Sequence, residues 1–290
     1  YDNSPNKSKL IILGSFERVN GAGFISGTGL NATVSFAGTA LQTIGDTLEN
    51  FTGTGGFNNL EINNTAGLQI NETGSIDIKG LLLLTAGKII VPNSASLTIT
   101  NTAVSTVVPE GGKSTSYVDG ALTKRINAGD RFWYPVGQGS VAGNNIQISE
   151  VNTVGTQSWK VNFLTPNGTS GNYIDPLYFV NSKELWNISA PATSQAKVNL
   201  MWNTYSDLTP LMTTNGVSDM RVARRVTGGS WNELASSAVG TNDAGTVTTS
   251  SLVTIAADSN LFSTACTNPI KPRAQFNNGT TPVCGDDSIP

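Results

Sequence analysis

The chain has 290 residues, a formal net charge of −3 and no histidine, and only 13% of its residues are charged, about half the share of a typical soluble domain. The absence of histidine excludes Ser-His-Asp and Cys-His catalysis and histidine-ligated metals. No Lys/Arg cluster is present to neutralise phosphates, which argues against nucleic-acid binding, and no apolar run reaches the roughly 18 residues of a membrane helix, which argues against membrane insertion.

Residues 1–112 predict a β-solenoid-like region. Its first apolar run, Leu10–Leu13, is expected to be a buried strand. Short apolar runs then follow turns of Gly, Ser or Asn roughly every seven to ten residues, as in the stacked coils of a solenoid. A stack of short hairpins is the alternative. The runs are 32–36, 41–44, 57–64, 67–70, 74–78, 80–84, 87–91 and 96–99.

The pattern of apolar runs and turns changes after Pro109–Lys113, which we take as the domain boundary. Longer runs of alternating apolar and polar residues, separated by clear turns, predict an antiparallel β-sandwich over residues 113–262. No stretch has a helical period, although 207–212 is compatible with one helical turn. The strictly alternating runs are 145–148, 159–163, 196–202, 220–224 and 246–249. The expected fold is therefore all-β, a solenoid-like half followed by a sandwich.

Residues 263–290 form a tail rich in Pro and Asn that holds both cysteines, Cys266 and Cys284. We expect a disulfide between them that closes this irregular segment, because an extracellular protein rarely keeps free thiols. The alternative is two free thiols. Two cysteines without any histidine make a zinc site improbable.

A series of strand and turn motifs follows in order along the chain: Phe57–Asn64 with Leu81–Lys88, Ser116–Lys124 with Tyr134–Gly137, Glu184–Ser189, Val198–Trp202, Arg221–Arg224 and Gly229–Trp231. In this order they resemble the large cell-surface and gliding-type adhesins of the Bacteroidota, which leave the cell by the type IX secretion route. The resemblance covers roughly residues 50–262 and lies in the order of its motifs, each of which is mainly strand and turn chemistry. Ala121 departs from the pattern, which usually has Pro there. The resemblance implies an extracellular adhesive or structural role and no catalytic residues.

The aromatic residues of the second half have two interpretations. They line a platform for sugars, whose apolar faces stack on rings, or they fill the sandwich core. Strict alternation around Trp159 and Trp202 favours the core for these two. Phe132, Trp133 and Tyr134 are consecutive, so they cannot all face inward on one strand, and they are the best candidate for a contact surface. The platform interpretation covers Trp133, Tyr134, Trp159, Trp186, Trp202 and Trp231.

Acidic residues are the remaining candidates for chemistry. None forms a dense cluster in the sequence, so we expect no enzymatic activity. A carbohydrate-active β-helix enzyme is the alternative, and it requires two carboxylates that meet in a groove beside Lys or Arg. The mid-chain acids are Glu61, Asp77, Asp119, Asp130 and Glu150.

Two kinds of surface modification or ligand remain open. Calcium stiffens many surface adhesins through Asp and Asn oxygens, and Asn242–Asp243 and Asp286–Asp287 are the acidic pairs to consider. The first pair is more simply a hairpin turn. Thr47 and Ser288 each lie in an Asp-Ser/Thr-apolar triplet, which resembles the O-glycan acceptor of Bacteroidota. These two residues are the candidate O-glycan sites.

Three functions follow from these patterns. The first is a non-enzymatic, secreted surface protein of the adhesin type, a stiff module for display or attachment whose partners are neighbouring modules or surface glycans. The second is a self-assembling filament subunit that adds a terminal strand to the edge of the next subunit. The third is the β-helix enzyme. A chain rich in Gly and hydroxyl residues that begins at Tyr1 is expected to be a processed piece of a longer extracellular protein.

Overall fold

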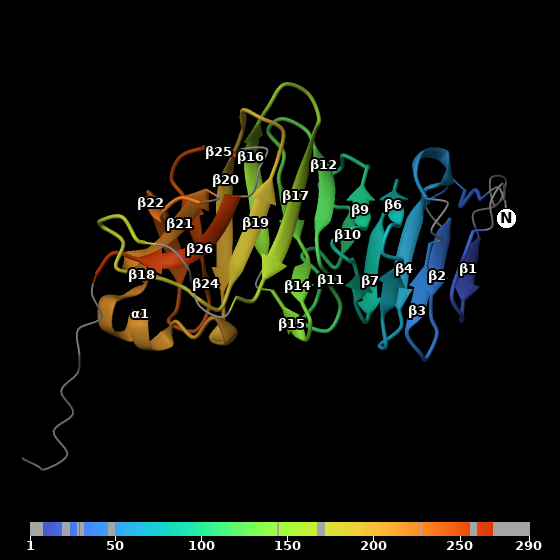
Figure 1. Ribbon diagram of the computed structural model, residues 1–290, viewed down its shortest axis with the longest axis horizontal. Helices are drawn as coiled ribbons and strands as arrows, with labels where there is room; N and C mark the ends of the chain where they lie inside the picture. The colour runs from blue at the N-terminus through green and yellow to red at the C-terminus, as the bar shows by residue number, and fades with distance from the viewer. Residues whose placement is uncertain are drawn as a thin grey trace, which may run out of the picture.

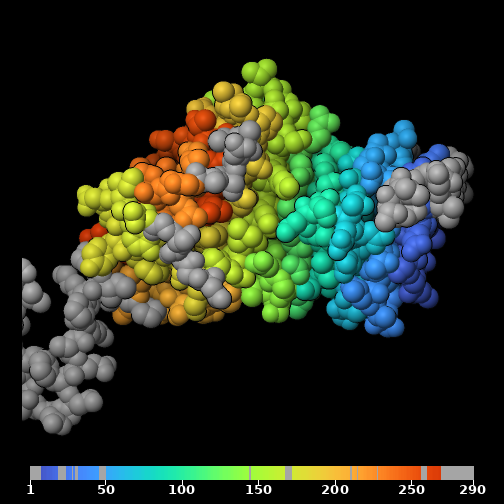
Figure 2. Space-filling model, viewed as in Figure 1, coloured from blue at the N-terminus to red at the C-terminus, as the bar shows by residue number. Residues whose placement is uncertain are grey.

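The computed structural model describes residues 8–18, 24–27, 29, 32–45, 50–143, 145–166, 172–226, 228–255 and 260–268. It confirms an all-β fold, with 51% strand and 6% helix. The molecule is elongated, with the solenoid strands at one end and the sandwich at the other (Figure 1). The space-filling view shows the solenoid half in order from blue to green along the long axis, and the sandwich half with yellow, orange and red segments side by side (Figure 2).

Two parallel sheets form two sides of a β-solenoid of about four turns. The first solenoid sheet has the order β1-β2-β4-β7-β10, which are Lys9–Ile12, Thr33–Phe36, Asn59–Asn63, Leu82–Ala86 and Val107–Val108. The second has the order β3-β5-β8-β11-β14, which are Gln42–Ile44, Leu68–Ile70, Ile89–Ile90, Val118–Asp119 and Val136–Gln138, with β15 (Val141–Ala142) antiparallel at its edge. The coils β2-β3, β4-β5, β7-β8 and β10-β11 each contribute one strand to each of these two sheets.

Apolar residues at the same register stack from coil to coil and fill the solenoid. Leu60 and Ile62 of β4 pair with Leu82 and Leu84 of β7, and all four side chains are fully buried. The polar turns are held by amide side chains. Asn64 donates hydrogen bonds through Nδ2 to the carbonyl of Ala40 at 2.7 Å and that of Gly67 at 3.2 Å. The alternation and the turn residues in the sequence therefore both have a direct structural role.

The third side of the solenoid continues into the sandwich as one sheet, which we call the shared sheet. Its path is β6-β9-β12-β17-β19-β26-β21-β22, and β18 pairs with β26. β12 pairs in parallel with β9 and antiparallel with β17, so the change of architecture takes place at this strand. The strands are Ser75–Ile78, Ser96–Ile99, Leu122–Ile126, Gln157–Leu164, Leu185–Ser189, Asn260–Cys266, Met220–Val226 and Asn232–Leu234, and β18 is Phe179–Val180.

A second sandwich sheet packs against the shared sheet. It has the antiparallel order β13-β16-β20-β24-β23, and β25 pairs with β20. The strands are Phe132–Tyr134, Ile146–Asn152, Ser194–Trp202, Gly245–Thr249, Ser236–Gly240 and Val253–Ile255. One α-helix, α1 (Thr209–Asn215), and three 3-10 turns, η1 (Gly53–Gly55), η2 (Thr204–Ser206) and η3 (Val217–Asp219), complete the described elements. Among the described residues no helix is long and apolar enough to cross a bilayer.

One hydrophobic core runs through both halves, from Phe24 to Cys266. The parallel pairing also continues past residue 112, because β11 and β14 still belong to the second solenoid sheet. The predicted boundary at 112 therefore marks a change of composition but no break in the core. At the other end, β26 runs to Cys266, so the sandwich extends beyond residue 262.

The first strand lies at an edge and is only half covered. Among the described residues, β1 pairs with β2 alone. Leu10 and Ile12 pack against the core, whereas Ile11 and Leu13 are 58% and 71% exposed. The expectation of a buried strand over Leu10–Leu13 was therefore wrong for Ile11 and Leu13, because within the part of the chain that the structure describes only β2 covers an edge of β1.

Candidate contact surface on the second sandwich sheet

The strand β13 divides the three consecutive aromatic residues between two faces. Phe132 and Tyr134 are buried in the core, where their rings meet edge to face with centroids 4.9 Å apart. The Tyr134 hydroxyl donates a hydrogen bond to the carbonyl of Trp159 at 3.0 Å. Trp133 is half-buried on the opposite face. The predicted contact surface is therefore reduced from three rings to Trp133, because side chains alternate along a strand.

The other tryptophans do not form a platform. Trp159, Trp186, Trp202 and Trp231 are each at most 1% exposed, which confirms the core interpretation for Trp159 and Trp202. The interpretation of these rings and Tyr134 as a sugar platform is wrong. Trp133 is the one tryptophan that reaches the surface.

Trp133 stands at the end of a row of polar side chains that crosses all five strands on the outer face. In register, Trp133 pairs with Gln147, Gln147 with Asn199, Asn199 with Thr248 and Thr248 with Ser237. We call these five residues the transverse row. The strand neighbours of Gln147 and Asn199, such as Ile148 and Val198, face the core, so the row faces away from it.

Hydrogen bonds between the side chains hold the row in a fixed orientation. Thr248 donates through Oγ1 to Oδ1 of Asn199 at 2.6 Å. Asn199 donates through Nδ2 to Oε1 of Gln147 at 3.3 Å and to Oγ of Ser149 at 2.9 Å. Because Gln147 and Asn199 are 8% and 7% exposed, these amides keep few rotamers, and their remaining donors and acceptors have fixed directions.

A polar groove of about 470 Å³ lies beside Gln147. A β-bulge between Ser149 and Asn152 shapes its wall, and Glu150 there has a φ of 50°, a conformation that a residue with a side chain rarely adopts. Lys197 donates a hydrogen bond through Nζ to Oε1 of Glu150 at 2.8 Å. The groove is lined by Val104, Gly129, Asp130, Arg131, Gln147, Ser149 and Glu150.

The arrangement offers a ring, amides, hydroxyls and charged groups along one face. A ring covers the apolar face of a sugar, and fixed amide and carboxylate groups satisfy its hydroxyls. The sequence carries a further signal for this surface, beyond the three consecutive rings. In 145–148 and 196–202 the polar positions that alternate with the core residues include Gln147 and Asn199, but neither segment alone contains the register that aligns them with Trp133.

The predicted acids are distributed over the molecule, and of these five only Asp130 and Glu150 line the same groove. Glu61 forms an ion pair with Lys9 at 2.5 Å, and Asp119 forms one with Lys88 at 3.0 Å, each on a solenoid sheet. Hydrogen bonds from Lys9, Ser35 and Thr85 lower the pKa of Glu61, against the effect of burial. A third acid, Asp77, accepts a hydrogen bond from the backbone of Gly53 at 2.9 Å.

Asp130 and Glu150 both line the polar groove together with Arg131. Two acids and a cation therefore line one groove on the sandwich, which is part of what the enzyme alternative requires. Among the described residues no group of three or more His, Cys, Asp or Glu side chains is placed to hold a metal ion.

Cys266 lies in β26 and not in an irregular tail. Its thiol is fully buried and free, and its pKa is raised to about 12, first by burial and then by the charge of Asp219. Such a thiol is a poor nucleophile for disulfide exchange. Cys284 lies outside the described residues, and no disulfide is seen in the described part of the chain. The disulfide between Cys266 and Cys284 therefore stays a prediction.

The other candidate positions fall in two groups. Thr47, Ser288 and Asp286–Asp287 lie outside the described residues. Asn242–Asp243 lies in the turn between β23 and β24, as the hairpin interpretation predicts, and Thr209 donates a hydrogen bond through Oγ1 to the Asp243 carboxylate at 2.9 Å.

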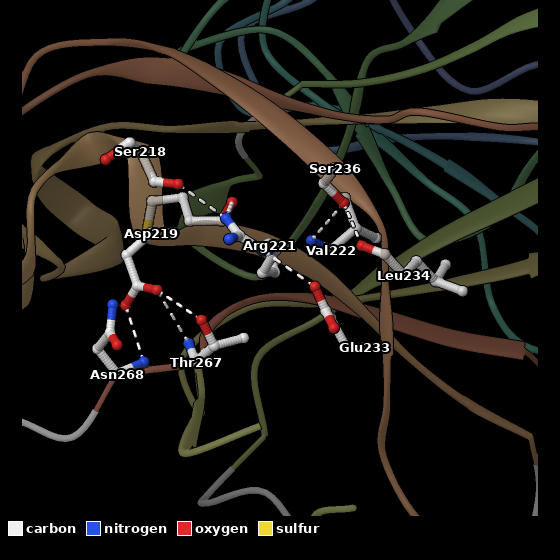
Figure 3. A network of polar contacts seen from close by, with 10 residues as sticks. Ser218, Asp219, Arg221, Val222, Glu233, Leu234, Ser236, Thr267 and Asn268 are labelled. Atoms are coloured by element: carbon white, nitrogen blue, oxygen red, sulfur yellow. Dashed lines mark hydrogen bonds and ion pairs between the residues drawn. The ribbon is translucent and has the colours of Figure 1, made fainter. Parts of the chain in front are cut away.

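Asp219 is a buried acid that no pattern in the sequence indicates. Its carboxylate accepts hydrogen bonds from the Thr267 hydroxyl at 2.6 Å and from the Asn268 backbone at 3.1 Å (Figure 3). It thereby fixes the chain just beyond the end of β26. Figure 3 also shows Arg221 paired with Glu233 through Nε, at 3.0 Å.

No protein-family model matches the chain, and neither the curated proteins nor the solved structures include a significant match to it.

Proposed function

We propose that this chain is a non-enzymatic, extracellular surface module of the adhesin type, a stiff β-rich rod for display or attachment, with the transverse row as its contact surface for glycans. The observation that carries the proposal is the position of Trp133, the one tryptophan at the surface, at the end of a hydrogen-bonded row beside a polar groove. An extracellular setting is supported by the low charge and the surface rich in hydroxyls and amides.

Stiffness is supported by the way the two halves are joined. The shared sheet and the common core leave no linker between solenoid and sandwich, so the sandwich cannot pivot on the rod. A rod of stacked coils satisfies its backbone hydrogen bonds along its whole length and holds a contact surface at a fixed distance from its base. A rigid rod with a contact surface at a fixed position is sufficient for passive display.

The transverse row is tested by removal of its ring. On a glycan array, wild type is expected to bind at least one glycan, and Trp133→Ala is expected to weaken that binding roughly tenfold, because stacking on the ring is lost. Tyr178→Ala is the matched control, since Tyr178 is 58% exposed and lies away from the row, and it is expected to bind as wild type does. Absence of binding to every glycan, or equal binding by Trp133→Ala, would contradict the proposal.

The same bound glycan distinguishes binding from catalysis. After prolonged incubation with wild type we expect no new reducing ends. Release of reducing ends that Glu150→Gln abolishes would show that Asp130 and Glu150 act as a catalytic pair, and the enzyme alternative would replace the proposal. Binding without product supports a passive contact surface.

A filament subunit is the second candidate, and the position of β1 at the edge of its sheet among the described strands favours it. An edge strand with exposed Ile11 and Leu13 is a template for a strand of another chain. Electron microscopy of the native protein is expected to show single rods. Regular filaments that disappear in Ile11→Asp, a change at a 58% exposed position, would instead establish the filament candidate.

A further inference from the structure

A charged side chain faces into the space between the two sandwich sheets. Along β21, Met220, Val222 and Arg224 share one face, and Met220 and Val222 belong to the core. Arg224 continues this face at the open end of the sandwich. Its guanidinium donates a hydrogen bond through Nη2 to Oδ1 of Asn260 at 2.6 Å.

Arg224 forms part of the wall of a pocket of about 260 Å³ at this open end. The pocket lies between β21 and β22 of the shared sheet and β24 and β25 of the second sandwich sheet. Leu234, which pairs with Val222 (both labelled in Figure 3), and Val253 contribute apolar surface. The described lining is Arg224, Leu234, Ala235, Thr249, Ser251, Leu252, Val253 and Thr254 and contains no acidic side chain.

The guanidinium is only partly satisfied. Its Nε is buried and has no hydrogen-bond partner among the residues that the structure describes. A buried donor without an acceptor is costly, and a charge removed from water needs an opposite charge or a set of acceptors. Burial lowers the pKa of Arg224. The neutral amide oxygen of Asn260 is the acceptor that the fold supplies.

We propose that this pocket binds a small molecule or chain end that carries a carboxylate. A carboxylate accepts two parallel hydrogen bonds from the fork of an arginine, so it would satisfy Nε and neutralise the charge together. Leu234, Leu252 and Val253 would cover an apolar body, and the hydroxyls of Ser251 and Thr254 would face polar groups on it. The site is separate from the transverse row and does not depend on the function proposed for it.

The carboxylate has two chemical sources of suitable size, a uronic acid and the C-terminal residue of a peptide. Calorimetric titration of the full chain with glucuronic acid and with N-acetyl-leucine distinguishes them. The neutral counterparts, glucose and N-acetyl-leucinamide, have the same bodies without the charge. We expect one of the acids to bind at least tenfold more tightly than its neutral counterpart. Equal binding of acid and neutral compound, or no binding of either acid, would overturn the proposal.

Two variants and one spectroscopic signal assign the binding to Arg224. Arg224→Gln is expected to weaken binding of the acid at least tenfold, and Arg224→Lys, which keeps the charge but not the fork, is expected to fall between. Arg125→Gln, at an exposed position on β12, is the matched control and is expected to bind as wild type does. In wild type, the Nε–H resonance of Arg224 is expected to shift as the acid is added. A resonance that does not move, or unchanged binding by Arg224→Gln, would contradict the assignment even if a variant proves unstable.

Discussion

Replacement of Phe51 by alanine is expected to lower the free energy of unfolding by about 3–5 kcal/mol, which is the cost of removing a phenylalanine from a packed core. Phe51 is fully buried. Its ring centroid lies 5.4 Å from that of Phe16, 5.3 Å from that of Phe24 and 5.2 Å from that of Phe57. The cavity would open at the centre of this cluster, where the neighbouring rings are held by their own strands and turns. Urea unfolding followed by far-UV circular dichroism measures the loss.

Tryptophan fluorescence makes the experiment sharper. All five tryptophans lie between residues 133 and 231, so their emission reports on the sandwich, whereas Phe51 lies in the solenoid. If one core joins the halves, the fluorescence midpoint in Phe51→Ala moves together with the dichroism midpoint. A fluorescence midpoint equal to that of wild type would mean that the halves unfold separately. Val154→Ala, at a 94% exposed position, is the control and is expected to change stability by less than about 0.5 kcal/mol.

A pH-dependent gain of about 2 kcal/mol relative to Lys124→Met is expected for wild type between pH 8 and pH 10. Lys124 lies on β12, where the shared sheet passes from solenoid to sandwich, and is 1% exposed. Its Nζ donates hydrogen bonds to the carbonyls of Asn101 and Arg125 and lies 5.3 Å from the centroid of the Phe132 ring. Burial lowers its pKa from 10.5 to about 8, although the charge of Asp130 acts in the opposite direction.

The direction of this pH dependence follows from the number of protons that the folded and unfolded states bind. Between pH 8 and 10.5 the unfolded chain keeps the Lys124 proton and the folded chain releases it, so the contribution of Lys124 to stability rises with pH. Cys266 and Tyr117, whose pKa values are each raised to about 12, oppose this rise in wild type and variant alike, so they cancel in the difference. Chemical denaturation of wild type and Lys124→Met at several pH values measures the difference between their free energies of unfolding. Lys160→Met, which removes a lysine from an exposed position, is the matched control. A constant difference for Lys124→Met would contradict the prediction.

The candidate surface was partly predictable. Three aromatic residues in succession on a strand require a ring on each face, and this local rule led to Phe132–Tyr134. It could not say that Phe132 and Tyr134 face the core, because that depends on which sheet covers the strand. The transverse row needed the register of four strand pairs, and strands as far apart as β13 and β24 meet in it. Arg224 presented the same problem, because only the position of β25 shows that a pocket lies over it.

The sequence by itself determined that the chain is all-β, where most strands lie and where several turns fall, as at 242–245. These properties depend on residues close together in the chain, through the alternation of side chains along a strand and the conformations that turn residues allow. The tertiary structure alone decided that β12 joins a parallel to an antiparallel sheet, that Cys266 is enclosed in the core and that β1 is an edge. The reason is physical: a strand offers hydrogen bonds on both edges to any partner, and the partner is selected by the packing of the whole molecule.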